Sequence, residues 1–303
     1  MRDPAVVPAP PVPPVDFTAL AGLPFTKMTG SGNDFVFFDG RLTPLDRVTS
    51  PEVIRRICNR NNGIGADGLV VLEPTGDGAD VTIHYFNSDG SPADLCGNAT
   101  LCSTTLAAQL EMASPVGMRL ATGAGVISSR LTGHGPGQLP EIDLQPVTDV
   151  RPTLDIKRAP GEQAIGLAVA GIPHLVVLCD DAEAVPLRER GPVLRHHPSL
   201  GPAGANVNWV SRQPDGRWRY RTFERGVEGE TLACGTGAVA TAVLLGAWGL
   251  AVGLVVTIVS SSGRPLQVRL PASDGANAEE QGRGQPSLRG EGRVVFRGVI
   301  AAL

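Results

Sequence analysis

Leu-Cys-Gly-Asn-Ala-Thr at residues 95–100 and Ala-Cys-Gly-Thr-Gly-Ala at residues 233–238 place two cysteines in nearly the same local sequence. Each cysteine follows a polar, glycine-containing turn and precedes a run of small and apolar residues that predicts a buried helix. Strand-like runs come before each segment, and further strands follow it. The cysteines, at positions 96 and 234, are separated by about the length of one domain. The chain is therefore expected to contain the same structural unit twice.

This repeat predicts an α+β protein with two similar domains, each a mixed or antiparallel sheet wrapped around a central helix. At 303 residues the chain is long enough for two hydrophobic cores. An apolar stripe behind a proline also predicts a short helix over Pro51–Cys58. The expected parts are a disordered proline-rich tail (1–22), a first domain with Cys96 (23–143, completed by a C-terminal strand within 292–303) and a second domain with Cys234 (144–291).

Composition excludes several classes of function. The 26 Lys and Arg residues against 30 Asp and Glu residues leave no basic surface for nucleic acid. No apolar run reaches the ~18 residues that a membrane span requires. The five cysteines form no CxxC pair and no zinc-like cluster with histidine, so we expect no metal and a reduced, cytoplasmic protein. Residues 272–290 are rich in Gly, Ala, Glu and Gln and are expected to form a solvated loop.

The two cysteine segments suit a particular chemistry. A cysteine at the start of a helix faces unpaired N–H groups and the positive end of the helix dipole, which favours the thiolate. The Gly-polar pairs that follow, Gly97-Asn98 and Gly235-Thr236, let backbone N–H groups approach a carboxylate or oxyanion. Two such thiols facing one substrate could remove a proton beside a carboxylate and return one to the opposite face.

Four segments then resemble the signature motifs of diaminopimelate epimerases, in the order and spacing of that family. They read FTKMTGSGNDF at residues 25–35, NNGIGADG at 61–68, NSDGSPADLCGN at 87–98 and ERGVEGETLACGTG at 224–237. The resemblance covers everything except the proline-rich tail. It implies two similar domains with the active site in the cleft between them. It also implies interconversion of LL- and meso-diaminopimelate, for lysine and cell-wall precursors, without pyridoxal phosphate or metal.

The resemblance also implies roles for individual residues. Cys96 and Cys234 would be the paired base and acid, and His174 would help to set the protonation of a thiol. A satisfied core histidine is an equally good interpretation of His174. Glu224 is counted with both the catalytic and the binding residues, because it can also meet an ammonium group. The binding residues implied are Gly97, Asn98, Gly235 and Thr236 at the reacting carboxylate, and Asn33, Asn87, Asn206, Glu224 and Arg225 at the distal amino-acid end.

Three positions depart from the family pattern: Ala99 and Leu101 stand where relatives usually have Gly and Arg, and Ile172 stands where many have Asn. Three alternatives remain beside the epimerase: a proline or hydroxyproline racemase of the same superfamily, a thiol redox switch in which Cys96 and Cys234 oxidise together, and a binding protein with a degenerate site. Leu101 and Ile172 motivate the third. The expected partners are a small amino-acid substrate and a second copy of the chain in a homodimer, with neither nucleic acid nor membrane.

Overall fold

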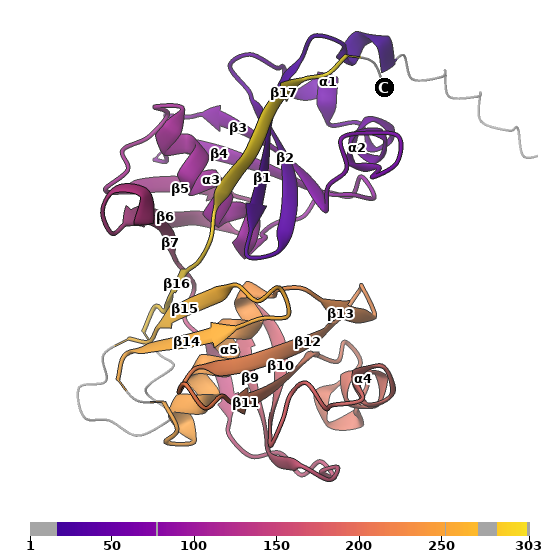
Figure 1. Ribbon diagram of the computed structural model, residues 1–303, viewed down its shortest axis with the longest axis vertical. Coiled ribbons are helices and arrows are strands. Elements are labelled where there is room, and N and C mark those ends of the chain that lie inside the picture. The colour runs from indigo at the N-terminus through magenta and orange to yellow at the C-terminus, as the bar shows by residue number, and fades with distance from the viewer. Residues whose placement is uncertain (1–16, 77, 252, 272–283, 302–303) are drawn as a thin grey trace, which may run out of the picture.

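The computed structural model describes residues 17–301 apart from residues 77, 252 and 272–283. Two lobes lie one above the other along the long axis (Figure 1). Residues 1–16 of the predicted tail lie outside the described residues. The end of that tail is structured, because Phe17–Leu20 form the 3-10 helix η1 and the Leu20 side chain is buried in the first lobe. The exact domain boundaries stay a prediction.

The first lobe contains seven consecutive strands, three α-helices and the 3-10 helices η1 and η2, and β17 (Arg293–Val299) from the end of the chain joins it. The strands are β1 (Pro24–Gly30), β2 (Asn33–Asp39), β3 (Gly68–Pro74), β4 (Val81–Asn87), β5 (Met118–Thr122), β6 (Gly125–Thr132) and β7 (Leu139–Asp143). The helices are α1 (Leu45–Val48), α2 (Pro51–Cys58), α3 (Gly97–Gln109) and the short 3-10 turn η2 (Gly135–Gly137). The predicted helix at Pro51–Cys58 is confirmed, and its Ser50 side chain caps the Val53 N–H at 3.3 Å.

The second lobe repeats this order. Its strands are β8 (Thr148–Arg151), β9 (Glu162–Ala170), β10 (Ile172–Cys179), β11 (Asn206–Arg212), β12 (Trp218–Glu224), β13 (Gly229–Thr231), β14 (Val255–Val259), β15 (Pro265–Arg269) and β16 (Ser287–Arg289). The last strand, β17 (Arg293–Val299), returns to the first lobe. Its helices are α4 (Leu187–Arg195), η3 (Pro198–Leu200) and α5 (Gly235–Ala247).

Strand pairing shows that the lobes are copies of one another. In both, an antiparallel hairpin (β1–β2, β9–β10) is followed by a parallel pair (β2–β3, β10–β11) and an antiparallel pair (β3–β4, β11–β12). The central helix then leads to a parallel neighbour (β4–β5, β12–β14) and another antiparallel pair (β5–β6, β14–β15). The predicted α+β fold with two repeated domains is confirmed.

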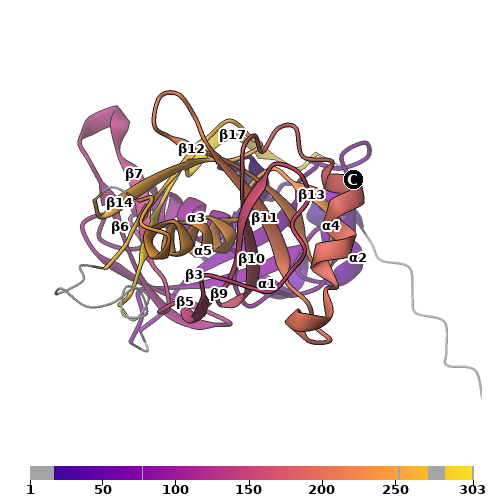
Figure 2. The same cartoon turned by 90° about the horizontal axis from the view of Figure 1, so that it is seen from below.

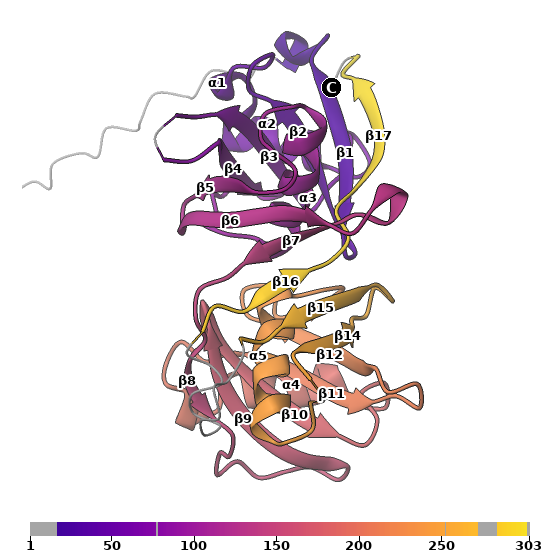
Figure 3. The same cartoon turned by 90° about the vertical axis from the view of Figure 1, so that its left-hand side faces the viewer.

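The lobes exchange strands at their junction. β7 pairs with β16, so the two sheets are continuous across the boundary, as Figure 3 shows. After β7 the chain enters the second lobe and β8 pairs with β9, whereas after β16 it returns and β17 pairs with β1. The expectation of a solvated loop over residues 272–290 is wrong for Ser287–Arg289, because β16 buries Leu288 completely between the sheets.

Each central helix is enclosed by its sheet (Figure 2). Neither α3 nor α5 contains a charged residue, and their buried positions run around the whole helix. A helix that is apolar on all sides is stable only inside a core. The buried Ser103, Thr104 and Thr241 hydroxyls donate to carbonyls one turn earlier, which satisfies them. This burial fixes the start of each helix, and with it each cysteine.

Candidate active site

Cys96 and Cys234 are the N-cap residues of α3 and α5. Their backbone angles are nearly equal, with φ and ψ of −133° and 114° for Cys96 and −127° and 107° for Cys234, and neither side chain caps its own helix. The helix starts meet: a Cβ built on either Gly97 or Gly235 would lie 3.9 Å from the Cα of the other glycine. The positive ends of two helix dipoles therefore converge on one place, which favours negative charge there.

Cys96 is a half-buried residue. Burial raises the pKa of Cys96, while the nearby backbone N–H groups of Ala99 and Asn98 and the Tyr85 hydroxyl act in the opposite direction. The charge of Glu224 is a smaller influence that raises it. The net effect on Cys96 is a raised pKa, which the neighbouring N–H and O–H groups limit.

Cys234 is more enclosed, with 7% of its surface exposed. Burial, followed by the charge of Glu224, raises the pKa of Cys234 to about 12. The Thr236 hydroxyl, 3.6 Å from the sulfur, and the Gly237 N–H oppose this rise. The Asn206 amide donates to the same sulfur at 3.9 Å. The charge of Cys96 also raises the pKa of Cys234, which brings the two thiols into one electrostatic unit.

His174 on β10 is connected to the Cys234 sulfur through one intervening side chain, that of Thr236. Its Nε2 is 3.1 Å from the Thr236 hydroxyl, and its Nδ1 is 3.4 Å from the Asn208 amide nitrogen. Burial, followed by the charge of Arg225, lowers the pKa of His174 to about 3, so the ring is neutral. The amide partner assigns Nδ1 as acceptor and Nε2–H as donor. A relay of donors therefore runs from Asn208 through His174 and Thr236 to the sulfur.

Sequence reasoning missed a tyrosine at each cysteine. Tyr85 on β4 is among the groups that lower the pKa of Cys96, and Tyr220 on β12 is buried beside Cys234. The Tyr220 hydroxyl accepts from the Cys234 N–H at 2.8 Å and donates to the Cys234 carbonyl at 2.6 Å. A signal was available, since the chain has two tyrosines and each lies on the strand before a cysteine motif.

The remaining predicted residues form two groups, one on each lobe. On the first, the Asn98 amide donates to Asn33 at 2.7 Å, Asn33 donates to Asp67 at 3.0 Å, and Asn87 accepts from Tyr85 at 3.1 Å. Asp67 was not predicted.

On the second lobe, the Asn206 side chain accepts from the Arg225 N–H at 2.9 Å, and Glu224 ends β12. Burial raises the pKa of Glu224. Its charge acts on both sulfurs, so Glu224 connects the two groups electrostatically.

The three unusual positions are accommodated by packing. Ala99 and Leu101 are buried in α3, and Leu101 belongs to the same apolar cluster as Leu288 and Ala238 of the second lobe. A Cβ on Gly292 would lie 2.6 Å from the Leu101 carbonyl oxygen, which shows how closely the returning chain crosses α3. Leucine here is part of the core that joins the lobes. Ile172 begins β10 and is partly buried.

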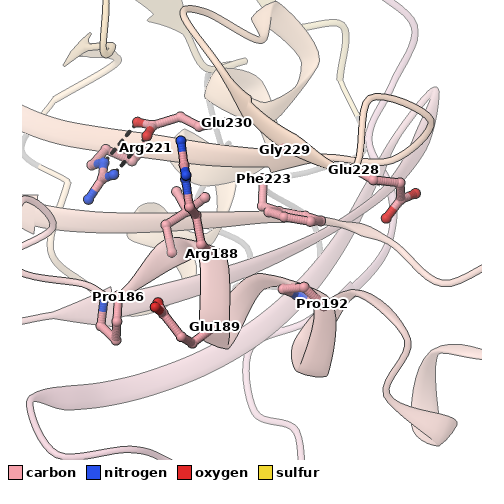
Figure 4. A pocket seen from close by; sticks show the side chains of 10 residues that line it. Pro186, Arg188, Glu189, Pro192, Arg221, Phe223, Glu228, Gly229 and Glu230 are labelled. Atoms are coloured by element: carbon pink, nitrogen blue, oxygen red, sulfur yellow. Dashed lines mark hydrogen bonds and ion pairs between the residues drawn. The ribbon is translucent and has the colours of Figure 1, made fainter.

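A hollow of about 760 Å³ lies elsewhere, between α4 and the β12–β13 hairpin. Figure 4 shows Arg188, Glu189 and Pro192 of α4 on one side and the Arg221–Glu230 ion pair on the other. Phe223 lines this hollow, and because side chains alternate along a strand, Glu224 points to the opposite face of β12. The hollow is therefore separate from the cysteines.

All five cysteines are free thiols. Within residues 17–301, leaving aside the gaps named above, no group of three His, Cys, Asp or Glu side chains is arranged to hold a metal ion. In the same part of the chain, none of the helices has the length and apolar character needed to cross a membrane.

Comparison with known proteins agrees with this geometry. The profile of the family described as diaminopimelate epimerase matches residues 25–138 and 167–284. The chain belongs to the diaminopimelate epimerase family. A diaminopimelate epimerase from Gemmatimonas aurantiaca is 65% identical over 92% of this chain and 99% of its own length. One from Aquifex aeolicus is 35% identical over 80% of this chain and 88% of its own length.

Solved structures share the fold at low sequence identity. A phenazine biosynthesis protein of the PhzF family from Bacillus anthracis is 14% identical with a TM-score of 0.70, covering 92% of this chain and 98% of that one. A probable proline racemase from Agrobacterium radiobacter is 20% identical with a TM-score of 0.63, covering 92% and 93%. At these identities the likeness shows the fold alone, and the family membership of this chain rests on its closer relatives.

Proposed function

We propose that this chain is an isomerase that interconverts LL- and meso-diaminopimelate, with Cys96 and Cys234 as the two acid–base groups. The observation that carries the proposal is the meeting of two cysteine-capped helix starts inside a member of the diaminopimelate epimerase family. Inversion at a carbon needs a base on one face and an acid on the other. Two matched thiols on opposed lobes supply that arrangement.

In the proposed reaction one cysteine enters as thiolate and the other as thiol. The substrate C–H bond breaks, its proton forms an S–H bond with the thiolate, and the electron pair stays on the carbon and its carboxylate. The second thiol then gives its proton to the opposite face and becomes the thiolate. The N–H groups at the two helix starts, from Gly97-Asn98 and Gly235-Thr236, would stabilise the charge that accumulates on the carboxylate.

The distal amino-acid end of the substrate is proposed to bind across both lobes. Arg225 can hold a carboxylate through two parallel hydrogen bonds, and Glu224 can hold an ammonium group. Asn33, Asn87 and Asn206 offer amide groups that both donate and accept. Because Asn206 already fixes the Arg225 backbone, its side chain also orients the hairpin that carries Arg225 and Glu224.

The test is proton NMR of the reduced protein with LL-diaminopimelate in deuterated water, without added pyridoxal phosphate or metal. We expect loss of the α-proton signal together with formation of the meso isomer. A Cys102→Ala variant is the matched control, because Cys102 is a buried cysteine of the same helix that faces the core. Exchange with proline or hydroxyproline but not with diaminopimelate would contradict the proposal in favour of the racemase. Absence of exchange with either, despite substrate binding, would favour a binding protein.

In this proposal, a disulfide between Cys96 and Cys234 forms only as a side reaction. If oxidation inactivates the protein and a reductant restores epimerisation, the redox behaviour follows from the catalytic geometry. Such a reactive pair fits a reducing compartment, so we propose the cytoplasm as its location. We also propose that the chain forms a homodimer. Light scattering coupled to size-exclusion chromatography would measure the mass of the assembly.

A further inference from the structure

Asn208 on β11 is a completely buried amide near the second cysteine, and none of the sequence motifs includes it. Its nitrogen donates to the Leu175 carbonyl at 3.2 Å and lies 3.4 Å from His174 Nδ1. Its oxygen accepts from the Thr222 hydroxyl at 2.8 Å. The amide therefore has hydrogen-bond partners at both of its ends, and one of these partners is the imidazole.

The main chain determines which way the Asn208 amide points. A carbonyl oxygen only accepts hydrogen bonds, so the amide atom beside the Leu175 carbonyl must be the nitrogen. A reversed amide would bring two buried oxygens together without a proton between them. A Cβ built on Gly237 would lie 2.5 Å from Asn208 Oδ1, so the glycine at this position of the second cysteine motif leaves room for the amide. The amide is thus oriented independently of the histidine.

This orientation determines where the proton of the imidazole lies. A neutral imidazole carries one N–H and one lone pair. Nδ1 of His174 faces an N–H of Asn208, so Nδ1 holds the lone pair and Nε2 holds the proton. Nε2–H donates to the Thr236 hydroxyl at 3.1 Å, and that hydroxyl keeps its own proton for the Cys234 sulfur at 3.6 Å. Three successive hydrogen bonds therefore point toward the sulfur.

The same contacts oppose a positive charge on the ring. A second proton would have to bind Nδ1, where it would meet the Asn208 N–H instead of an acceptor. Among the groups around the completely buried His174, Cys234 at the start of α5 is reached through Thr236, and Arg225 after β12 is a cation. Burial and the charge of Arg225 both lower the pKa of His174. A histidine that takes a proton from a thiol must become an imidazolium, and this ring is not arranged for that.

We propose that Asn208 is a positioning residue that holds His174 in the neutral Nε2–H tautomer, so that His174 serves as a hydrogen-bond donor toward Cys234 and not as the base that deprotonates it. The proposal deepens the proposed epimerase function and rests on it for the role of Cys234. The Nε2–H bond stays intact throughout the reaction. Its hydrogen bond polarises the Thr236 hydroxyl, which donates more strongly to the sulfur when Cys234 is a thiolate. The proton of Cys234 is then exchanged with the substrate carbon and not with the imidazole.

The first test is nitrogen NMR of protein that contains nitrogen-15-labelled histidine, because the shift of each ring nitrogen shows whether it carries a proton. The His174 signals are identified by their loss in His174→Gln. We expect a protonated Nε2 and an unprotonated Nδ1 at every pH between about 5 and 9, although an unperturbed histidine titrates near pH 6.5. A proton on Nδ1, or titration of the ring within this range, would overturn the proposal.

A pair of substitutions tests the step from Asn208 to the ring. Asn208→Asp replaces the N–H donor by a carboxylate oxygen of the same shape, so Nδ1 should gain a proton. Thr222→Val is the matched control, because it removes the hydroxyl at the other end of the amide and leaves the Leu175 carbonyl in place. It should keep the proton pattern of the unmodified protein. An unprotonated Nδ1 in Asn208→Asp, or a moved proton in Thr222→Val, would contradict the role of Asn208.

These measurements separate the role of Asn208 from the proposed reaction. The first test uses the unmodified chain, so it decides the proposal even where Asn208→Asp does not fold. Neither test requires a substrate, so both remain decisive if the protein fails to epimerise diaminopimelate. Conversely, an active epimerase in which His174 titrates near neutral pH would refute the role of Asn208 alone.

Discussion

Cys96 and Cys234 start equivalent helices with nearly equal backbone angles, yet their neighbours treat the two sulfurs differently. At the half-buried Cys96, the Tyr85 phenol and two backbone N–H groups oppose the rise in pKa that burial causes. At Cys234 the sulfur is buried, and Glu224 is the strongest charged influence on it. The repeat therefore supplies position, while side chains that differ between the two copies set the surroundings of each thiol.

The largest expected effect comes from removing either thiol. Cys96→Ser and Cys234→Ser should each lower the rate of epimerisation by about 10²–10⁴-fold, because a serine hydroxyl is a far weaker acid than a thiol. Each variant keeps one base, so each should still exchange the α-proton of one isomer. Proton NMR in deuterated water, starting from LL and from meso substrate in turn, assigns each cysteine to a face. If both variants exchanged the same isomer, the opposed-thiol arrangement would be wrong.

Glu224→Gln should reduce the difference between the two sulfurs. Loss of the carboxylate charge favours thiolate, and the charge ranks higher among the influences on Cys234 than among those on Cys96. The alkylation midpoint of Cys234 should therefore fall by about one pH unit, with a smaller fall at Cys96. Glu230→Gln on the same hairpin is the control, since Glu230 pairs with Arg221 away from the thiols. Equal shifts at both sulfurs would remove this source of asymmetry.

Thr236→Val should have a smaller effect in the opposite direction. It removes the hydroxyl that donates to the Cys234 sulfur and that His174 contacts at 3.1 Å. The Cys234 midpoint should rise by about half a pH unit, and turnover should fall by about 10-fold. Thr241→Val, five residues later in the same helix, is matched in chemistry, because its hydroxyl donates to the Gly237 carbonyl and not to a sulfur. An unchanged Cys234 midpoint would show that the His174 relay does not reach the sulfur.

Much of this arrangement could be predicted from the sequence, because it depends on local patterns. Pro51–Cys58 carries a proline, a cap and an apolar stripe, and the two uncharged runs after Cys96 and Cys234 have few alternatives to a buried helix. β16 was missed since only three residues form it and Leu288 is buried by strands distant in sequence, β7 and β15.

The tyrosines were missed for a related reason. Where the Tyr85 ring lies depends on the register of β4 against β3 and on the space left by Gly68. Whether Tyr220 meets the Cys234 main chain depends on how β12 lies along α5. Local propensity carries no information about either distance.

The smallest expected effect concerns stability and separates the two tyrosines again. Tyr220→Phe leaves the buried Cys234 N–H without its 2.8 Å partner, whereas the Cys234 carbonyl still accepts from the Ala238 N–H at 3.0 Å. One buried donor left unpaired costs about 1–3 kcal/mol of unfolding free energy, which urea denaturation would measure. Tyr85→Phe should cost less, because Tyr85 and its acceptor Asn87 are only partly buried, so water can reach the Asn87 oxygen that the hydroxyl leaves. If Tyr85→Phe were the more destabilising change, the clamp that Tyr220 forms on the Cys234 main chain would not be the stronger of the two tyrosine contacts.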